Sequence, residues 1–180
     1  MTRYVALFRG INVGKAKRIA MADLRALLES MGYSRVQTLL NSGNVVFDGP
    51  TAVAMKHAQQ IRAAVHAELG VDALVIVKSA KDIAAAIEGN ALANVATDPS
   101  RLLVAFMSDA KALAALQSMA DAAWGAERVH VGKHAAYVWC ANGILDSKVA
   151  VALLKNLAQS GTTRNWATVE KIYALMQREA

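Results

Sequence analysis

The order of strand-like and helix-like segments in residues 3–78 constrains the fold more than any other feature of this sequence. Continuous apolar runs at Tyr4–Arg9 and Ala73–Lys78 are typical of buried strands. Two further runs, Val36–Leu40 and Val45–Phe47, flank Asn41-Ser42-Gly43-Asn44, where a glycine can take the positive φ of a tight hairpin. Apolar residues at helical spacing over 21–31 and 58–69 predict two helices, each ended by a glycine. The predicted order is β-α-β-β-α-β, the arrangement called ferredoxin-like.

Residues 101–157 nearly repeat this order, as β-α-β-β-α without a clear final strand. Leu102–Met107 is a continuous apolar run, and Arg128–Val131 with Ala135–Cys140 predicts a second hairpin. One helix is predicted between them from the spacing of Leu113, Leu116, Met119 and Ala123. Asp146-Ser147 is a suitable N-cap region for the next helix, and a last helix follows from Val169. We therefore predict an α+β chain of two ferredoxin-like subdomains, residues 1–88 and 101–180, joined by residues 89–100.

Composition excludes some classes of protein. With 55% hydrophobic residues, the 180-residue chain is too apolar to be mainly disordered. It holds no uncharged apolar stretch of about 20 residues, so no membrane-spanning helix and no membrane partner are expected. The apolar run Tyr4–Phe8 is too short for the core of a signal peptide, which makes the cytoplasm the expected location. Cys140 is the single cysteine, so an internal disulfide is excluded.

The positive charge of the chain is concentrated near the N-terminus. The formal net charge is +6, and no acid precedes Asp23. The cations in that first segment are Arg3, Arg9, Lys15, Lys17 and Arg18. Such a basic cluster attracts phosphorylated metabolites, nucleic acid or acidic proteins, although a modest positive charge also serves solubility.

The strongest candidate for a binding motif is the segment from Arg9 to Arg18, which leaves a buried strand and enters a helix. Its glycines let the backbone turn and expose amide groups, and the following helix N-terminus favours anions. The candidate ligand-binding residues here are Arg9, Gly10, Asn12, Gly14, Lys15 and Arg18. The spacing is neither that of a Walker loop nor that of a dinucleotide-binding GxGxxG motif.

Polar residues gather at three further places. Asn41, Ser42 and Asn44 lie in the predicted hairpin turn and could present their side chains beside the first loop. Ser147-Lys148 opens a predicted helix. Thr162-Thr163-Arg164-Asn165-Trp166 precedes another helix, where hydroxyl, guanidinium and amide groups would converge. Thr163, Arg164 and Asn165 would suit a phosphate or carboxylate, although helix capping explains one or two of them.

Catalytic and metal-binding patterns are weak. His57, His66, His130 and His134 lack metal-ligand spacing and are expected at the surface. No pair of acids is placed for general acid–base work, so the sequence assigns no catalytic residue, metal or cofactor. Lys148 as a proton donor, with Ser147 or Thr163 positioning a substrate, is the one catalytic arrangement that the motifs allow.

Taken in order, these motifs resemble a bacterial family of unknown function, numbered 1697. The matching residues are Arg9-Gly10-Ile11-Asn12-Val13-Gly14, Met21, Leu24, Ser42-Gly43-Asn44-Val45, Ser147-Lys148, Thr163-Arg164-Asn165-Trp166 and Thr168-Val169. Lys15 and Lys17 stand where the family usually has a glycine and an asparagine, which makes this loop more basic, and Ala167 stands where an asparagine is common. The resemblance implies an α+β fold with two ferredoxin-like subdomains and implies no activity.

Three functions fit these residues. The first is a cytosolic binding protein for a small phosphorylated ligand, with one wall from residues 9–18 and another from Lys148 and 163–165. The second is nucleic-acid binding, which the charge favours, although the aromatic content of 6% offers few stacking platforms. The third is an enzyme acting on a small phosphorylated substrate. The sequence assigns no oligomeric state.

Overall fold

The computed structural model describes residues 1–178, which form two compact units. Unit 1 comprises Met1–Lys81 and the C-terminal residues from Ile172 on, and unit 2 comprises Asp82–Lys171. The predicted connection, residues 89–100, contains no helix or strand and lies within unit 2. The predicted α+β class is confirmed, because each unit has a four-stranded antiparallel sheet with helices packed on it.

The sheet of unit 1 contains β1 (Thr2–Phe8), β2 (Ser34–Leu39), β3 (Asn44–Gly49) and β4 (Val75–Ser79). Their order is β2-β3-β1-β4, and every neighbouring pair is antiparallel. Strands β1 and β3 therefore occupy the centre of the sheet. The predicted hairpin is present as β2 and β3, which pair up to Leu39 opposite Asn44.

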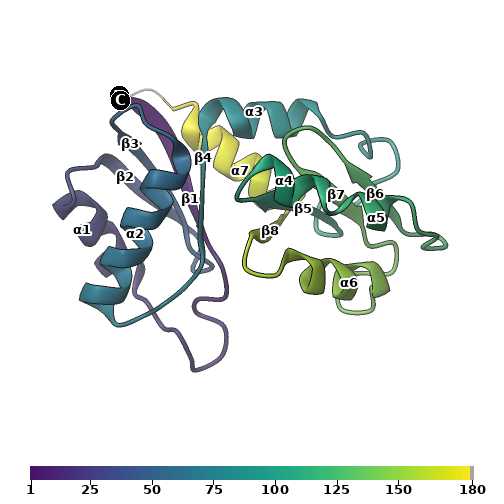
Figure 1. Cartoon of the computed structure of the whole chain (residues 1–180), viewed down its shortest axis with the longest axis horizontal. Helices are drawn as coiled ribbons and strands as arrows, with labels where there is room; N and C mark the ends of the chain where they lie inside the picture. Colours follow the sequence, from purple (N-terminus) through teal and green to yellow (C-terminus); the bar gives the residue numbers. More distant parts are fainter. Residues whose placement is uncertain (179–180) are drawn as a thin grey trace. The chain divides into compact units, whose positions relative to one another are not determined.

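Helices α1 (Met21–Ser30) and α2 (Ala54–Leu69) lie side by side on one face of this sheet (Figure 1). Leu24 and Leu28 of α1, and Ile61 and Val65 of α2, pack against the strand residues of that face. The strand residues in this core are Tyr4, Ala6, Phe8, Val36, Val45, Phe47, Val75 and Val77. Their spacing of two along each strand reflects the alternation of side chains across a sheet.

The sheet of unit 2 contains β5 (Leu102–Met107), β6 (Arg128–Val131), β7 (Ala136–Trp139) and β8 (Gly161–Asn165), in the order β6-β7-β5-β8. Strand β8 corrects the prediction of a polar junction at 162–165. It pairs antiparallel with β5 along its whole length, from Met107 opposite Gly161 to Leu103 opposite Asn165. The sequence did not reveal this strand because its residues, GTTRN, include no apolar side chain, whereas the ladder to β5 depends on backbone groups.

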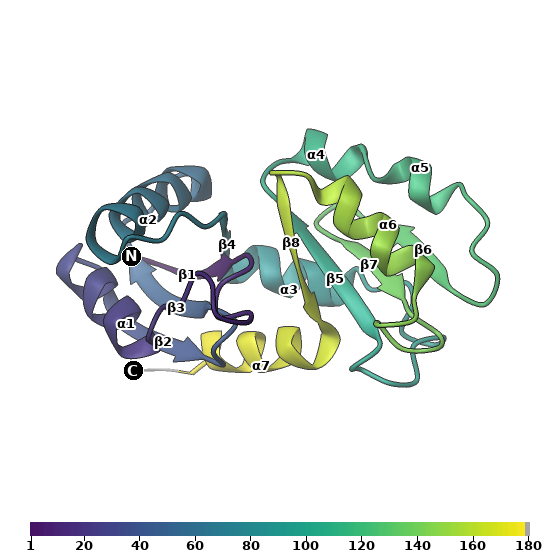
Figure 2. The same ribbon diagram turned by 90° about the horizontal axis from the view of Figure 1, so that it is seen from below.

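Helices α4 (Ala110–Ala114), α5 (Gln117–Ala120) and α6 (Lys148–Leu157) cover one face of this sheet (Figure 2). One continuous helix was predicted where α4 and α5 are found. Hydrogen bonds from Leu116 N to Leu113 O and from Met119 N to Leu116 O span three residues rather than four. This tighter winding interrupts the α-helix and still buries all three apolar side chains.

Two helices complete the chain, α3 (Ala80–Glu88) and α7 (Trp166–Met176), and the boundaries between the units fall inside them. On unit 2, α3 is held to the sheet face opposite α6 by the Tyr137 hydroxyl, which donates a hydrogen bond to the carbonyl of Ala86. Among the described helices, none combines the length and the apolar character that crossing a membrane requires.

Candidate functional site

Asn12 organises the loop between β1 and α1. Its backbone is left-handed, with φ 55°, which asparagine tolerates better than most residues. Its Oδ1 accepts a hydrogen bond from Ile19 N at 2.8 Å, and its Nδ2 donates to Ile19 O at 2.9 Å and to Asn41 O at 2.7 Å. The predicted binding residue Asn12 therefore closes the loop and ties it to the β2–β3 turn.

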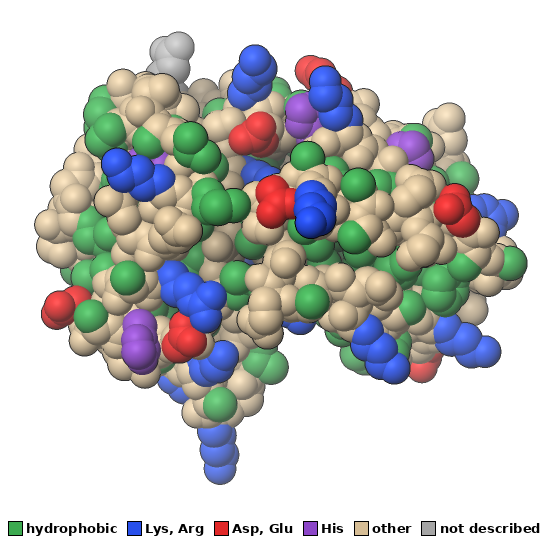
Figure 3. Space-filling model, viewed as in Figure 1, with side chains coloured by type: hydrophobic (Ala, Val, Ile, Leu, Met, Phe, Trp, Pro, Cys, Tyr) green, Lys and Arg blue, Asp and Glu red, His purple; other side chains and the backbone are tan. Residues whose placement is uncertain are grey.

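The outer part of this loop is exposed and basic. Val13 and Ala16 form a small antiparallel bridge, which makes the segment a narrow turn rather than a cradle around an anion. Lys15, Lys17 and Arg18 are all exposed. Figure 3 shows Lys and Arg side chains gathered where Figure 1 places this loop, at the lower end of unit 1. Arg18 Nη1 donates to Gly14 O at 3.3 Å, so the guanidinium folds back over the turn.

The turn between β2 and β3 packs closely under the loop. Gly43 has φ 87°, and an added Cβ there would lie 2.6 Å from Ile11 Cδ1. Asn44 is fully buried, and its Nδ2 donates to Leu39 O at 2.8 Å and to Ser42 Oγ at 3.1 Å. The amide of Asn44 therefore stabilises the turn, and the carbonyl of Asn41 accepts the hydrogen bond from the Asn12 side chain.

A pocket of about 320 Å³ opens where the loop, the turn and α1 meet. It is lined by Asn12, Arg18, Ile19, Ala20, Met21 and Asn41. Ala20 is the N-cap of α1, and its side chain makes no capping hydrogen bond. The positive end of the α1 dipole thus borders the pocket beside the Arg18 guanidinium. Asp23, exposed in the first turn of α1, is the opposing negative charge.

In unit 2, the N-terminus of α6 already has two partners. Ser147 Oγ accepts a hydrogen bond from Ala150 N at 3.0 Å, so the predicted N-cap is confirmed. Glu127 Oε2 accepts from Val149 N at 3.2 Å and brings a carboxylate to the same helix end. Lys148 is exposed beside them. The Glu127 carboxylate therefore already occupies this helix end. The positive potential left for a ligand is lower here than at the N-terminus of α1.

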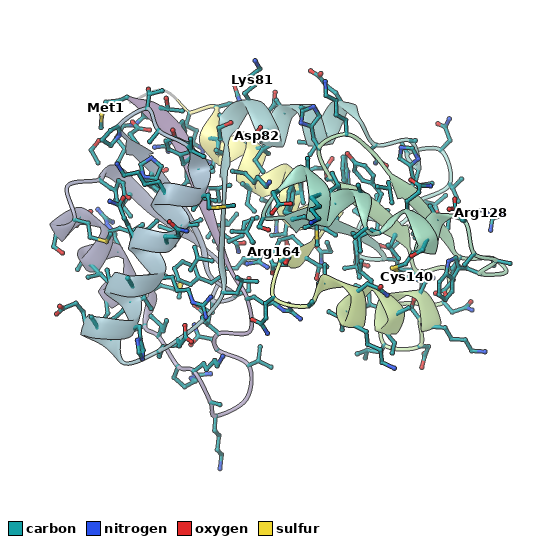
Figure 4. The ribbon with its side chains drawn as sticks, viewed as in Figure 1. Met1, Lys81, Asp82, Arg128, Cys140 and Arg164 are labelled. Atoms are coloured by element: carbon teal, nitrogen blue, oxygen red, sulfur yellow. The ribbon has the colours of Figure 1, made fainter. Side chains whose placement is uncertain are left out.

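Strand β8 contains the remaining predicted ligand-binding residues, Thr163, Arg164 and Asn165, and places them on two different faces of the sheet. Because side chains alternate across a strand, Thr163 and Asn165 lie on one face and Arg164 on the other. Arg164 is buried on this edge strand (Figure 4), where its Nη1 donates to Thr162 Oγ1 at 3.1 Å and to Thr163 O at 2.8 Å. Burial lowers the pKa of Arg164 to about 10. Asn165 Oδ1 accepts from Thr168 N at 2.9 Å and so caps α7.

The expectation of a surface position is wrong for His57. This residue is 3% exposed and lies one α-helical turn before Ile61, on the buried face of α2. That spacing was the sequence signal for its burial. Glu127 had no comparable signal, because it lies 22 residues from the amide that it caps. Within residues 1–178, no three His, Cys, Asp or Glu side chains are grouped to hold a metal ion.

The fold and the pocket together define an α+β protein of two four-stranded antiparallel sheets, with a basic loop at one helix N-terminus. The chain belongs to the family described as "Protein of unknown function (DUF1697)", whose family model matches residues 1–137. The predicted resemblance to this family is thereby confirmed. A search of curated proteins gave no match.

One solved structure similar to this chain is described as "The structure of conserved bacterial protein SP0830 from Streptococcus pneumoniae". The two are 24% identical, the match covers 98% of this chain and 99% of that chain, and the TM-score is 0.80. At that identity the likeness shows a shared fold.

Proposed function

We propose that this protein is a cytoplasmic binding protein for a small phosphorylated ligand, held in the pocket at the N-terminus of α1. The observation that carries the proposal is a pocket of about 320 Å³ at a helix end that has no capping side chain. Helix N-termini bind phosphate because their first amides have no partner within the helix. The pocket volume falls within the range of about 300–1,000 Å³ that small-molecule sites occupy.

The charges around the pocket support a phosphate over a neutral ligand. Arg18 lines the pocket, and a guanidinium can donate two parallel hydrogen bonds to a phosphate. Lys15 and Lys17 are exposed on the same loop and add long-range attraction. The Asn12 hydrogen bonds to Ile19 hold the loop in shape before a ligand arrives, which reduces the entropy cost of binding.

The proposal includes a ferredoxin-like subdomain in each unit. In unit 1 the support is the element order β1-α1-β2-β3-α2-β4 with both helices on one face of the sheet. In unit 2 the support is β8, which supplies the final strand that the sequence pattern lacked. Such a subdomain leaves loops at the sheet ends free to carry a site.

Nucleic-acid binding is the second candidate, favoured by the exposed cations of the loop. RNA-recognition modules of similar topology stack bases on aromatic side chains of the sheet. In unit 1, the strand residues on the face away from the helices include Arg3, Val5, Leu7, Val46 and Ile76, and none of the described residues there is aromatic. We therefore rank a small phosphorylated ligand first, and an enzyme acting on such a ligand third.

The test uses inorganic phosphate and pyrophosphate as probes, followed by amide NMR and by calorimetry. We expect the amides of residues 20–23 to shift and pyrophosphate to bind more tightly than phosphate. Arg18→Gln should weaken pyrophosphate binding about tenfold, because a charge-assisted hydrogen bond contributes about 1.5–3 kcal/mol. Arg25→Gln is the matched control. It also removes one positive charge, at an exposed residue of α1 that is paired with Glu29, and it should leave the affinity for pyrophosphate unchanged.

Three results would contradict the proposal. The first is shifts spread over the whole surface, and the second is equal losses in Arg18→Gln and Arg25→Gln. The third is single-stranded RNA that binds at about 50 mM salt and loses about 100-fold in affinity at about 200 mM, which would favour nucleic-acid binding.

A further inference from the structure

Unit 1 contains a second pocket, larger than the first and of different chemistry. Its volume is about 620 Å³, and it lies between the C-terminal end of α1, the segment that follows β3 and the first half of α2. Met31, Tyr33, Pro50 and Ala52 supply apolar lining. A volume of this size accommodates a small organic molecule with room for a ring or a branched chain.

The inner wall of this pocket is polar. The Tyr33 hydroxyl and His57 Nδ1 are 2.9 Å apart, and His57 Nε2 is 3.1 Å from Pro50 O. A carbonyl oxygen only accepts hydrogen bonds, so His57 Nε2 donates to Pro50 O, and the Tyr33 hydroxyl is the partner of the other ring nitrogen. Burial raises the pKa of Tyr33, which keeps the hydroxyl protonated. Both side chains have partners already, so they shape the pocket rather than bind charge.

The outer wall is one face of α2. Lys56, Gln60 and Ala63 line the pocket at positions i, i+4 and i+7, which lie above one another on a helix. Lys56 is the one charged residue among the lining residues, and it is exposed. The first turn of α2 contains no acidic residue, and its N-cap, Val53, has no capping side chain. The polar end of the pocket is therefore positive.

We propose that this pocket binds a small organic carboxylate with an apolar ring or branched chain. The apolar body would contact Met31, Pro50 and Ala52, and the carboxylate would accept hydrogen bonds from Lys56 Nζ and Gln60 Nε2. This specificity differs from that of the α1 pocket, which is bordered by the basic loop. The two proposals stand on separate residues, so each can fail without the other.

The experiment compares phenylacetate, phenylacetamide and phenethylamine, which share a ring and differ in charge. Amide NMR titration of the full chain should show shifts in residues 31–33, 51–52 and 56–63. We expect phenylacetate to bind about fivefold more tightly than phenylacetamide, because an exposed ion pair contributes up to about 1 kcal/mol. Phenethylamine should bind most weakly, because its ammonium would face Lys56.

Two variants test the assignment of residues. Lys56→Gln should bind phenylacetate and phenylacetamide equally, and Ala63→Phe should weaken both because the ring would occupy the pocket. Ala63 is exposed, so Ala63→Phe leaves the core unchanged. Lys111→Gln, in unit 2, is the matched charge control. Arg18→Gln should also leave phenylacetate binding unchanged, which separates this site from the proposed phosphate site.

The inference is overturned if the unmodified protein binds acid and amide equally, or if Lys56→Gln keeps its preference for the acid. Shifts that cluster around residues 18–23 would also overturn it, because they would mean that the carboxylate occupies the phosphate pocket.

Discussion

The side chain of Asn12 joins two parts of the chain that are 29 residues apart. Its Nδ2 lies 2.7 Å from the carbonyl oxygen of Asn41 and 2.9 Å from that of Ile19. The same side chain accepts from Ile19 N. One residue therefore closes the basic loop and attaches it to the β2–β3 turn, so the shape of the α1 pocket depends on it.

Asn12→Ala should lower the free energy of unfolding by about 2–3 kcal/mol, because it leaves Ile19 N and Asn41 O without this partner and places alanine at a left-handed φ. Urea unfolding measures the loss. Asn156→Ala is the control: Asn156 makes one exposed hydrogen bond, to Ala152 O, and should cost less than about 0.5 kcal/mol. Similar losses in both variants would show that Asn12 has no special role.

Gly43→Ala should be more destabilising than Gly14→Ala, although both glycines have a positive φ. A Cβ at Gly43 would lie 2.6 Å from Ile11 Cδ1 and 2.7 Å from Phe8 Cβ, whereas one at Gly14 would meet nothing within 4 Å. We expect a loss of about 3 kcal/mol at Gly43 and about 1 kcal/mol at Gly14, measured by thermal unfolding. Equal losses would mean that φ alone matters and that the turn can move away from Ile11.

Ser147→Ala should cost about 1 kcal/mol, because Ala150 N loses the hydroxyl that caps α6. Glu127→Gln keeps an oxygen near Val149 N but removes the charge from the helix end, so it should cost about 0.5 kcal/mol. Denaturant unfolding of both variants measures these losses. An unchanged midpoint in Ser147→Ala would show that Glu127 alone is sufficient to cap the helix.

Asp23→Asn should strengthen pyrophosphate binding about threefold, because it removes a negative charge from the first turn of α1, beside the proposed site, where water screens the interaction. Calorimetric titration measures the gain. Glu88→Gln, at the exposed C-terminal end of α3 in unit 2, makes the same change in net charge and should have no effect. An equal gain in both variants would indicate a general charge effect rather than a site at α1.

Tyr137 should make stability depend on alkaline pH. Burial raises the pKa of Tyr137 from 10.0 to about 12, so the folded state favours the neutral hydroxyl. The resulting stability is fully present below about pH 10 and is lost as the pH rises toward 12. The difference in free energy of unfolding between the unmodified protein and Tyr137→Phe should stay constant up to pH 10 and then shrink. A constant difference up to pH 12 would contradict this assignment.

Local patterns were sufficient for most elements. The runs Tyr4–Arg9 and Leu102–Met107 identified β1 and β5, and helical spacing identified α1, α2 and α6. Ser147 was recognisable as an N-cap because capping involves residues close in sequence. In the candidate site, the sequence indicated the basic loop and its helix, whereas a position of the β2–β3 turn beside the loop was one of two alternatives.

Other features depend on partners that are distant in sequence. Strand β8 exists because β5 offers it a backbone ladder, and that strand places Thr163 and Arg164 on opposite faces. Glu127 caps α6 across 22 residues, which weakens the case for an anion at Ser147-Lys148. Tyr33, Lys56 and Gln60 meet in one pocket only after α1 and α2 pack on the same sheet face.

Sequence patterns alone predict the α+β class, the central strands, most helices and the position of the basic loop. These follow from side-chain periodicity and turn chemistry, which act over a few residues. Tertiary contacts determine which polar residues face a pocket and which satisfy a helix end or a turn. That choice depends on hydrogen bonds and packing between segments far apart in the chain, as the contact between Asn12 and Asn41 shows.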